Sequence, residues 1–244
     1  MHLSRVSIGL PGATPHPVIE ALAPQIEAAG FRGLWLNDTP DGDSLAGLLA
    51  AARVTSTLAL GTGVIPLDRR PATGILAALG GLPVDRLSVG IGTGAAKHGL
   101  ALVEQSVAEL RAGTGAAIIV GALGPRMRAL AARVGDGVLL NWLTPEAAAA
   151  QRSALVEPVT TILYARTALD PDALPALEAE AARYGSYPAY AANFERIGAS
   201  PLQTTITDRV GIRRYLGAVD ELVLRVVTRE QTLGAYEEFL RAVQ

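Results

Sequence analysis

Residues 118–128 read Ile-Ile-Val-Gly-Ala-Leu-Gly-Pro-Arg-Met-Arg, an apolar strand followed by a glycine turn and the start of a helix. Gly121 and Gly124 let the backbone approach a ligand closely, and Pro125 suits the first helical position, where no intrahelical amide bond is lost. The free amides there carry partial positive charge, and Arg126 adds a charged donor. The stretch predicts either an anion-binding turn or a plain strand-to-helix connection whose arginines face water.

The same strand-then-helix pattern recurs along the whole chain. The eight strands that it predicts cover residues 3–10, 33–37, 58–65, 87–91, 116–121, 137–141, 158–165 and 221–227. The predicted helices cover residues 17–29, 44–55, 73–79, 100–111, 125–133, 145–155 and 230–243, with a further helical stretch after residue 170. Alternation implies an α/β fold with parallel strands and right-handed crossovers, and the count of eight favours a closed (β/α)8 TIM barrel over an open doubly wound sheet.

Composition restricts the class of protein. A chain of 244 residues, half of them hydrophobic, fits one domain over residues 1–244 with a sizeable core. Its apolar runs are interrupted well before the roughly 18 to 20 residues that a membrane helix needs, so no membrane partner is expected. The formal net charge is −2 and the basic residues are scattered, which argues against nucleic acid. The N-terminal sequence is not typical of a signal peptide, and we expect a cytoplasmic protein.

The interval from residue 166 to residue 220 is about twice as long as the other connections, which predicts a helical insertion between strands seven and eight. It contains a large share of the few aromatic residues, namely Tyr184, Tyr187, Tyr190 and Phe194. These side chains either pack the insertion onto the barrel or form a wall of a substrate pocket.

In such a barrel, ligands bind where the strands end. The predicted strand ends are rich in glycine and short polar residues, a pattern that fits a flat phosphorylated ligand against the backbone and equally fits ordinary turns. Asp38 follows the second strand. It is predicted either to carry a proton or accept a hydrogen bond from a cofactor ring, or to cap a turn with Thr39 and Pro40.

Other site types are poorly matched. The segment 90–95 resembles a dinucleotide-binding glycine loop, but Glu109 falls inside a predicted helix and not at the end of the next strand. No metal site is predicted, because His2, His16 and His98 are far apart and there is no cysteine. His98 is either an exposed loop residue or a catalytic group.

Several segments, taken in order, resemble the bacterial luciferase-like flavin and deazaflavin oxidoreductases. The similar segments are residues 27–31 with 34–38, residues 58–64 with Arg70 and Pro71, residues 86–94, residues 121–127, residues 136–143, and the later residues Tyr184, Pro188, Tyr190 and Phe194. One departure concerns the connection between the fourth helix and the fifth strand, because residues 111–115 join them directly where relatives carry a longer covering segment.

The resemblance implies a TIM barrel that holds an isoalloxazine-like ring at its carboxyl face. It implies a bulge with a non-prolyl cis peptide bond near the end of the third strand, and a phosphate site at the turn after the fifth. The implied cofactor-binding residues are Asn37, Asp38, Thr62, Gly63, Val64, Gly92, Thr93, Gly94, Gly121, Ala122, Leu123, Gly124, Pro125, Arg126 and Asn141.

The implied activity is hydride transfer between the deazaflavin F420 and a small organic substrate, because the sequence Gly-Pro-Arg-Met at residues 124–127 resembles the deazaflavin-dependent branch of the family. Asp38 is the candidate proton carrier, since histidine and glutamate residues that some relatives use have no clear match. The alternatives are an FMN-dependent monooxygenase and, because the covering segment is missing, a non-catalytic flavin-binding or structural protein. We expect a homodimer from the resemblance.

Overall fold

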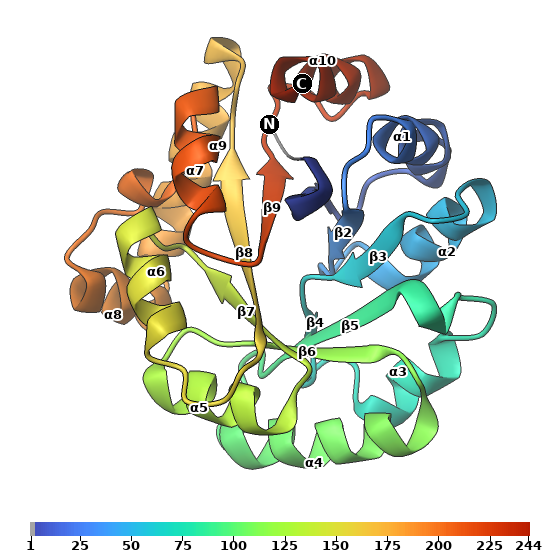
Figure 1. Ribbon diagram of the computed structural model, residues 1–244, viewed down its shortest axis with the longest axis vertical. Helices are drawn as coiled ribbons and strands as arrows, with labels where there is room; N and C mark the ends of the chain where they lie inside the picture. The colour runs from blue at the N-terminus through green and yellow to red at the C-terminus, as the bar shows by residue number, and fades with distance from the viewer. Residues whose placement is uncertain (1–2) are drawn as a thin grey trace.

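The computed structural model describes residues 3–244, in which parallel strands close into a barrel (Figure 1). The strands are β1 (Val6–Pro11), β2 (Gly33–Asn37), β3 (Ala59–Thr62), β4 (Ile65–Pro66), β5 (Leu87–Gly92), β6 (Ala117–Gly121), β7 (Gly137–Asn141), β8 (Thr160–Thr167) and β9 (Glu221–Val226). The pairing of β3 with β5 completes the ring, and β4 continues the third strand position beyond a break. The predicted (β/α)8 TIM barrel is confirmed, with its third strand in two pieces.

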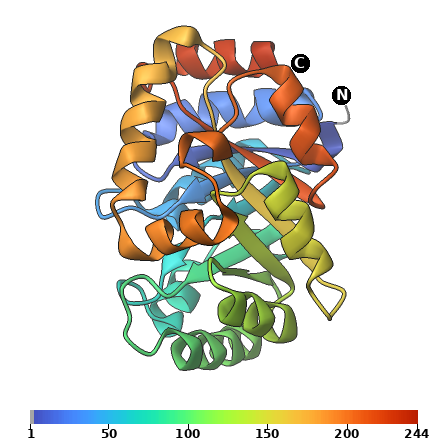
Figure 2. The same cartoon turned by 90° about the vertical axis from the view of Figure 1, so that its left-hand side faces the viewer.

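Helices surround the barrel (Figure 1 and Figure 2). They are α1 (His16–Ala28), α2 (Ser44–Val54), α3 (Ala72–Ala78), α4 (Gly99–Gly113), α5 (Pro125–Val134), α6 (Pro145–Ser153), α7 (Leu174–Gly185), α8 (Pro188–Ile197), α9 (Arg209–Leu216) and α10 (Leu233–Val243). The insertion between the seventh and eighth barrel strands consists mainly of α7 and α8, as predicted. None of the helices within residues 3–244 is both long and apolar enough to cross a membrane.

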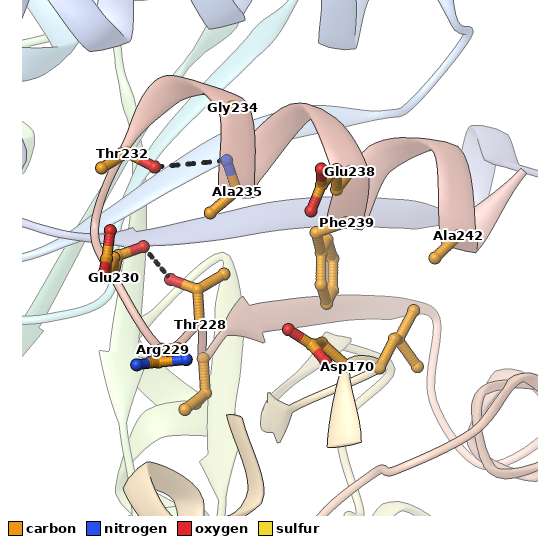
Figure 3. A pocket seen from close by; sticks show the side chains of 12 residues that line it. Asp170, Thr228, Arg229, Glu230, Thr232, Gly234, Ala235, Glu238, Phe239 and Ala242 are labelled. Atoms are coloured by element: carbon orange, nitrogen blue, oxygen red, sulfur yellow. Dashed lines mark hydrogen bonds between the residues drawn. The ribbon is translucent and has the colours of Figure 1, made fainter. Parts of the chain in front are cut away.

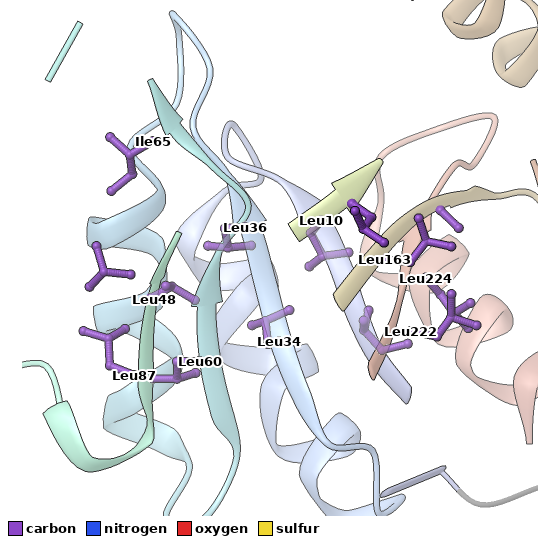
Figure 4. Packing of buried hydrophobic residues seen from close by; sticks show 14 of the residues in the cluster. Leu10, Leu34, Leu36, Leu48, Leu60, Ile65, Leu87, Leu163, Leu222 and Leu224 are labelled. Atoms are coloured by element: carbon purple, nitrogen blue, oxygen red, sulfur yellow. The ribbon is translucent and has the colours of Figure 1, made fainter. Parts of the chain in front are cut away.

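Alternate residues of each strand face opposite sides of the barrel wall. In β1, Ile8 and Leu10 join the large core between strands and helices, whereas Ser7 and Gly9 face the barrel interior. The larger core is dominated by leucine, isoleucine and valine (Figure 4). The interior holds a second, smaller cluster of Trp35, Ile119, Leu139, Ile162, Tyr164 and Val223. Polar residues in the inward register therefore lie either in the interior or at its two ends.

The strand-beginning end of the barrel is held together by the buried carboxylate of Glu221. Its Oε1 accepts hydrogen bonds from Ser7 Oγ at 2.6 Å and Trp35 Nε1 at 2.7 Å. Its Oε2 accepts one from Arg32 Nε at 2.7 Å. Because the donors belong to β1, β2 and the segment just before β2, one carboxylate ties the last strand to the first two.

Three local predictions were wrong. Leu3–Arg5 is a turn of 3-10 helix, so β1 begins at Val6 and not at residue 3. The third strand is interrupted at residues 63–64. The last helix begins at Leu233 and not at residue 230, because the Thr232 hydroxyl caps it by accepting a hydrogen bond from the amide of Ala235 at 3.4 Å.

Candidate functional site

A cavity of about 500 Å³ lies where the strands end. Most of the residues predicted to bind a cofactor line it: Asn37, Asp38, Gly63, Val64, Gly92, Thr93, Gly94, Gly121, Ala122, Leu123, Gly124 and Asn141. The structure thus brings together strand ends that are up to about a hundred residues apart in the sequence, on the face where (β/α)8 barrels bind ligands.

Three predicted residues do not line this cavity. Thr62 is fully buried, and its hydroxyl joins β3 to β5 by donating to Gly90 O at 2.9 Å and accepting from Gly90 N at 2.8 Å. Pro125 and Arg126 are exposed at the start of α5, just outside the cavity. Thr62 therefore shapes the site from behind, and Arg126 has access to a ligand only at its outer rim.

The floor of the cavity is formed by the break in the third strand. A cis peptide bond joins Gly63 and Val64, at the position that the family resemblance implied. The Val64 side chain occupies the space beside two strand-end glycines, because a Cβ added to Gly92 or Gly121 would lie 2.8 or 3.0 Å from one of its methyl groups. Larger residues at these glycines would collide with Val64, so the glycines keep the floor flat.

The turn after β5 is held by a side chain from the third connection. The amide of Ala95 donates to Asp68 Oδ2 at 2.9 Å, and Gly94 has a φ of +57°. A Cβ on Gly94 would lie 1.7 Å from Asp68 Oδ1, so this position requires glycine. His98 is exposed at the start of α4 and does not line the cavity, which matches its reading as a surface residue.

The start of α5 has free amides beside the cavity. Gly124 occupies the N-cap position without a side-chain cap and Pro125 is the first helical residue. Arg128 Nη1 donates to Leu123 O at 2.6 Å and so fixes the turn. An uncapped helix start that follows a strand end and borders a cavity suits an anionic group, which favours the anion-site reading of this turn over a plain connection.

Asp38 is partly engaged in the structure. Its Oδ1 accepts hydrogen bonds from Ser44 N at 3.0 Å and Ser44 Oγ at 2.9 Å, so it anchors the beginning of α2 and does not form the predicted turn with Thr39 and Pro40. Its backbone carbonyl accepts a hydrogen bond from Arg69 Nη2 at 3.0 Å. Asp38 nevertheless lines the cavity, where its second carboxylate oxygen is available.

Three buried polar atoms that belong to cavity-lining residues have no partner among the described residues. They are Asn37 Oδ1 and the hydroxyl oxygens of Thr39 and Tyr164. Burial raises the pKa of Tyr164 to about 12, so its hydroxyl is protonated near neutral pH. Buried polar groups ordinarily have partners. The Asn37 amide and the Tyr164 phenol adjoin the floor at Gly63, where a flat ring that carries both donors and acceptors would fit.

Sequence reasoning missed a group of charged residues on the opposite wall. Arg166 on β8 and Arg225 on β9 are register partners, and both line the cavity together with Glu180 on α7. Arg166 Nε donates to Glu180 Oε1 at 3.0 Å, and its Nη1 donates to Asn141 Oδ1. The signal was present in the period-two pattern of the strands, which puts Arg225 on the same side as Val223.

The aromatic residues of the insertion serve both predicted purposes. Phe194 packs edge-on against Trp142, with 5.8 Å between ring centroids, and thereby fixes α8 to the barrel. Tyr184 and Tyr190 line the cavity, with their ring centroids 4.8 Å apart, whereas Tyr187 is exposed. Burial raises the pKa of Tyr190 to about 12. Two of the four aromatics therefore form part of the cavity wall.

A second cavity, of about 470 Å³, lies between α10 and the loops after β8 and β9 (Figure 3). Asp170, Glu230 and Glu238 surround it, with Arg229 as its single basic residue and Phe239 on one side. This excess of acidic groups does not suit a phosphate. Within residues 3–244 no group of three metal-ligating side chains is close enough to hold an ion, and His2 lies outside the described residues.

Comparison with known proteins agrees with the geometry. The model of the luciferase-like monooxygenase family matches residues 3–114. No curated protein sequence is significantly similar to the chain. Among solved structures, an F420-dependent secondary alcohol dehydrogenase in complex with an F420-acetone adduct superposes with a TM-score of 0.72 at 13% identity, over 98% of this chain and 99% of that one.

Two further solved structures have a similar fold. The coenzyme F420-dependent tetrahydromethanopterin reductase of Methanopyrus kandleri has a TM-score of 0.68 at 15% identity and covers 98% of each chain. The oxygenating constituent of 3,6-diketocamphane monooxygenase of Pseudomonas putida, in complex with FMN, has a TM-score of 0.60 at 12% identity, over 97% of this chain and 96% of that one. At these identities the superpositions establish the fold.

Proposed function

Because residues 3–114 carry the sequence pattern of the luciferase-like monooxygenase family, we propose that the protein is an F420-dependent oxidoreductase acting on a small organic substrate. The observation that carries the proposal is the pairing of two unpartnered buried groups, on Asn37 and Tyr164, with the flat glycine floor of the same cavity. When bound, F420 supplies a carrier that accepts or donates a hydride.

The described residues fit such a cofactor. Val64 would support the ring, and the Tyr164 hydroxyl and the Asn37 amide would supply hydrogen bonds to it. The free amides at the start of α5 would bind the phosphate, with Arg126 at the rim. The proposed ring floor and the phosphate turn border the same cavity, and a Cβ on Gly121 would lie 3.0 Å from a Val64 methyl group, so a single ligand would reach both.

The protein orients the substrate and limits access of water. Tyr184 and Tyr190 cover one side of the cavity, because α7 and α8 fold over the ends of β7 and β8. The short connection of residues 114–116 from α4 to β6 lies at the other end of the barrel, where the strands begin, and does not border this cavity. The free oxygen of Asp38 is our candidate for holding a proton at the cavity edge.

Two alternatives remain distinct proposals. An FMN-dependent monooxygenase uses the same floor and phosphate turn, and the diketocamphane enzyme with FMN supports it. A non-catalytic flavin-binding protein is the other alternative, although the short connection between α4 and β6 that suggested it lies away from the cavity, where the strands begin. We favour F420 because of the Gly-Pro-Arg-Met turn at residues 124–127 and because two of the compared structures are F420-dependent enzymes.

Fluorescence titration of the purified protein with F420 and with FMN tests the proposal. Saturable binding of F420, at least about tenfold tighter than that of FMN, is the expected result, and tighter binding of FMN would favour the monooxygenase. Saturable binding of neither would refute both enzyme proposals. Tyr164→Phe removes the hydroxyl while keeping the ring, and it is expected to weaken binding about 5- to 15-fold through the loss of one hydrogen bond. Tyr236→Phe, on α10 outside the cavity, is the matched control.

A further inference from the structure

The cavity wall opposite the glycine floor carries two arginines side by side. Arg166 and Arg225 are direct register partners on the adjacent parallel strands β8 and β9. Their side chains are only 5% and 13% exposed. Like charges placed directly opposite each other destabilise a sheet, and burial makes the repulsion stronger. A protein keeps such a pair where something negative balances it.

Glu180 supplies only part of that balance. Its Oε1 accepts the hydrogen bond from Arg166, whereas its Oε2 lies 3.9 Å from Arg225 Nη2, beyond hydrogen-bond distance. Although burial favours the neutral acid, the two guanidinium groups hold the pKa of Glu180 below its usual range, so the carboxylate is charged. Among the poorly exposed charges, one negative charge faces two positive ones, which leaves an excess of one positive charge within this wall; Arg183 also lines the cavity, but it is exposed to solvent.

The two arginines differ in how firmly they are held. Arg166 lies over the rings of Trp142 and Tyr184, with its central carbon 4.3 and 4.6 Å from their centroids, and it also donates to Asn141. Arg225 donates to the backbone carbonyl of Val226 and otherwise faces Glu180 at the longer distance. Arg225 therefore retains N–H donors for a ligand, and a guanidinium presents them in the parallel arrangement that a carboxylate accepts.

We propose that Arg225, with Arg166 beside it, binds the carboxylate of a small monocarboxylate substrate in this cavity. A single carboxylate matches the single excess charge. The rest of the substrate lies against Tyr184 and Tyr190, and its reacting carbon faces the floor at Gly63 and Val64. The inference rests on the proposed function, because that floor is where we place the cofactor ring.

Calorimetric titration of the cofactor-free protein tests the carboxylate site directly. Benzoate is the probe, because its ring suits the tyrosine wall, and benzamide is its uncharged counterpart. We expect benzoate to bind at least about tenfold tighter than benzamide. Arg225→Gln is expected to abolish this preference, and Arg225→Lys to retain part of it. Arg229→Gln, an exposed arginine of the second cavity, should leave it unchanged.

Glu180→Gln gives a result that a merely structural role does not produce. Removing the competing carboxylate should strengthen benzoate binding several-fold, while benzamide binding stays the same. Equal binding of benzoate and benzamide by the native protein, or weaker benzoate binding by Glu180→Gln, would overturn the proposal. Inorganic phosphate that binds tighter than benzoate and is lost in Arg225→Gln would identify a phosphate site instead, which also overturns it.

Failure of this proposal is separable from failure of the proposed function. The benzoate titrations contain no cofactor, and the F420 and FMN titrations contain no carboxylate ligand. Benzoate selectivity without any cofactor binding would refute the oxidoreductase but retain the carboxylate site. Cofactor binding without benzoate selectivity would refute the carboxylate site alone.

Discussion

Replacing Glu221 by glutamine is expected to destabilise the barrel strongly without disturbing the ligand cavity. The residue is 5% exposed, and its carboxylate accepts three hydrogen bonds, from Ser7, Trp35 and Arg32. A glutamine has one oxygen and one NH2 group at the same positions. Because Trp35 and Arg32 can only donate, the NH2 group must oppose a donor in either orientation.

The cheaper orientation points the glutamine NH2 toward Arg32. Arg32 is 49% exposed, so water compensates for much of the lost ion pair. The hydrogen bonds from Ser7 and Trp35 remain, but they lose the charged acceptor, which weakens each of them by about half. Together these losses predict a decrease of about 2 to 4 kcal/mol in the free energy of unfolding.

Urea unfolding, followed by tryptophan fluorescence and by circular dichroism, measures this decrease. The matched control is Glu104→Gln, whose carboxylate pairs with Arg133 at 2.8 Å while both side chains are more than half exposed. We expect the control to lose less than about 1 kcal/mol. A loss below about 0.5 kcal/mol for Glu221→Gln, or a change in its cofactor affinity, would refute this account of the strand-beginning end.

Three further predictions concern the floor of the cavity, its rim, and the stability of the protein in acid. Gly121→Val fills the floor, where an added Cβ would lie 3.0 Å from a Val64 methyl group, and should weaken cofactor binding at least about tenfold in the fluorescence titration; Gly80→Val, in open space, should not. Arg126→Ala should cost about 0.5 to 1.5 kcal/mol of cofactor binding energy at low salt and less at high salt, and no change at low salt would remove this exposed residue from the site. Hydrogen bonds from Arg70 hold the pKa of Asp43 in the folded protein below its ordinary value of 3.8. The Arg70–Asp43 pair therefore stabilises the folded protein fully above pH 3.8, and this stabilisation is lost as the pH falls through the lower pKa of the folded state. Arg70→Gln should therefore be destabilised near neutral pH, and its deficit in urea unfolding should shrink in acid.

The strand ends could be predicted because local patterns determine them. A glycine turn between an apolar run and a helix start marks a strand end wherever it occurs, and a closed barrel brings all strand ends to one face. Gly63, Gly92 and Gly121 were found in this way. The break in the third strand could not be predicted from local patterns in the same way. It depends on how Val64 packs between neighbouring strands and not on the residues of the third strand alone.

The cavity wall that carries Arg166, Arg225 and Glu180 was not predicted, for two physical reasons. The predicted seventh strand ended at residue 165, one position before Arg166, whereas β8 continues to Thr167 because its backbone pairs with β9 as far as Val226. Extending the alternation by one step places Arg166 inward with Ile162 and Tyr164. Glu180 left no comparable trace, because an inserted helix can pack in many ways and only tertiary contacts fix which side faces the cavity.

The two ends of the barrel treat buried charge in opposite ways, and the difference indicates which end binds a ligand. Around Glu221, one carboxylate receives three hydrogen bonds, so the cluster is complete without any further group. Around Arg225, two guanidinium groups share one carboxylate at the edge of a cavity. A completed cluster contributes stability, whereas an unbalanced charge persists only where it serves another purpose. Because the imbalance faces the same cavity as the unpartnered groups of Asn37 and Tyr164, cofactor and carboxylate would each complete a different wall of one site.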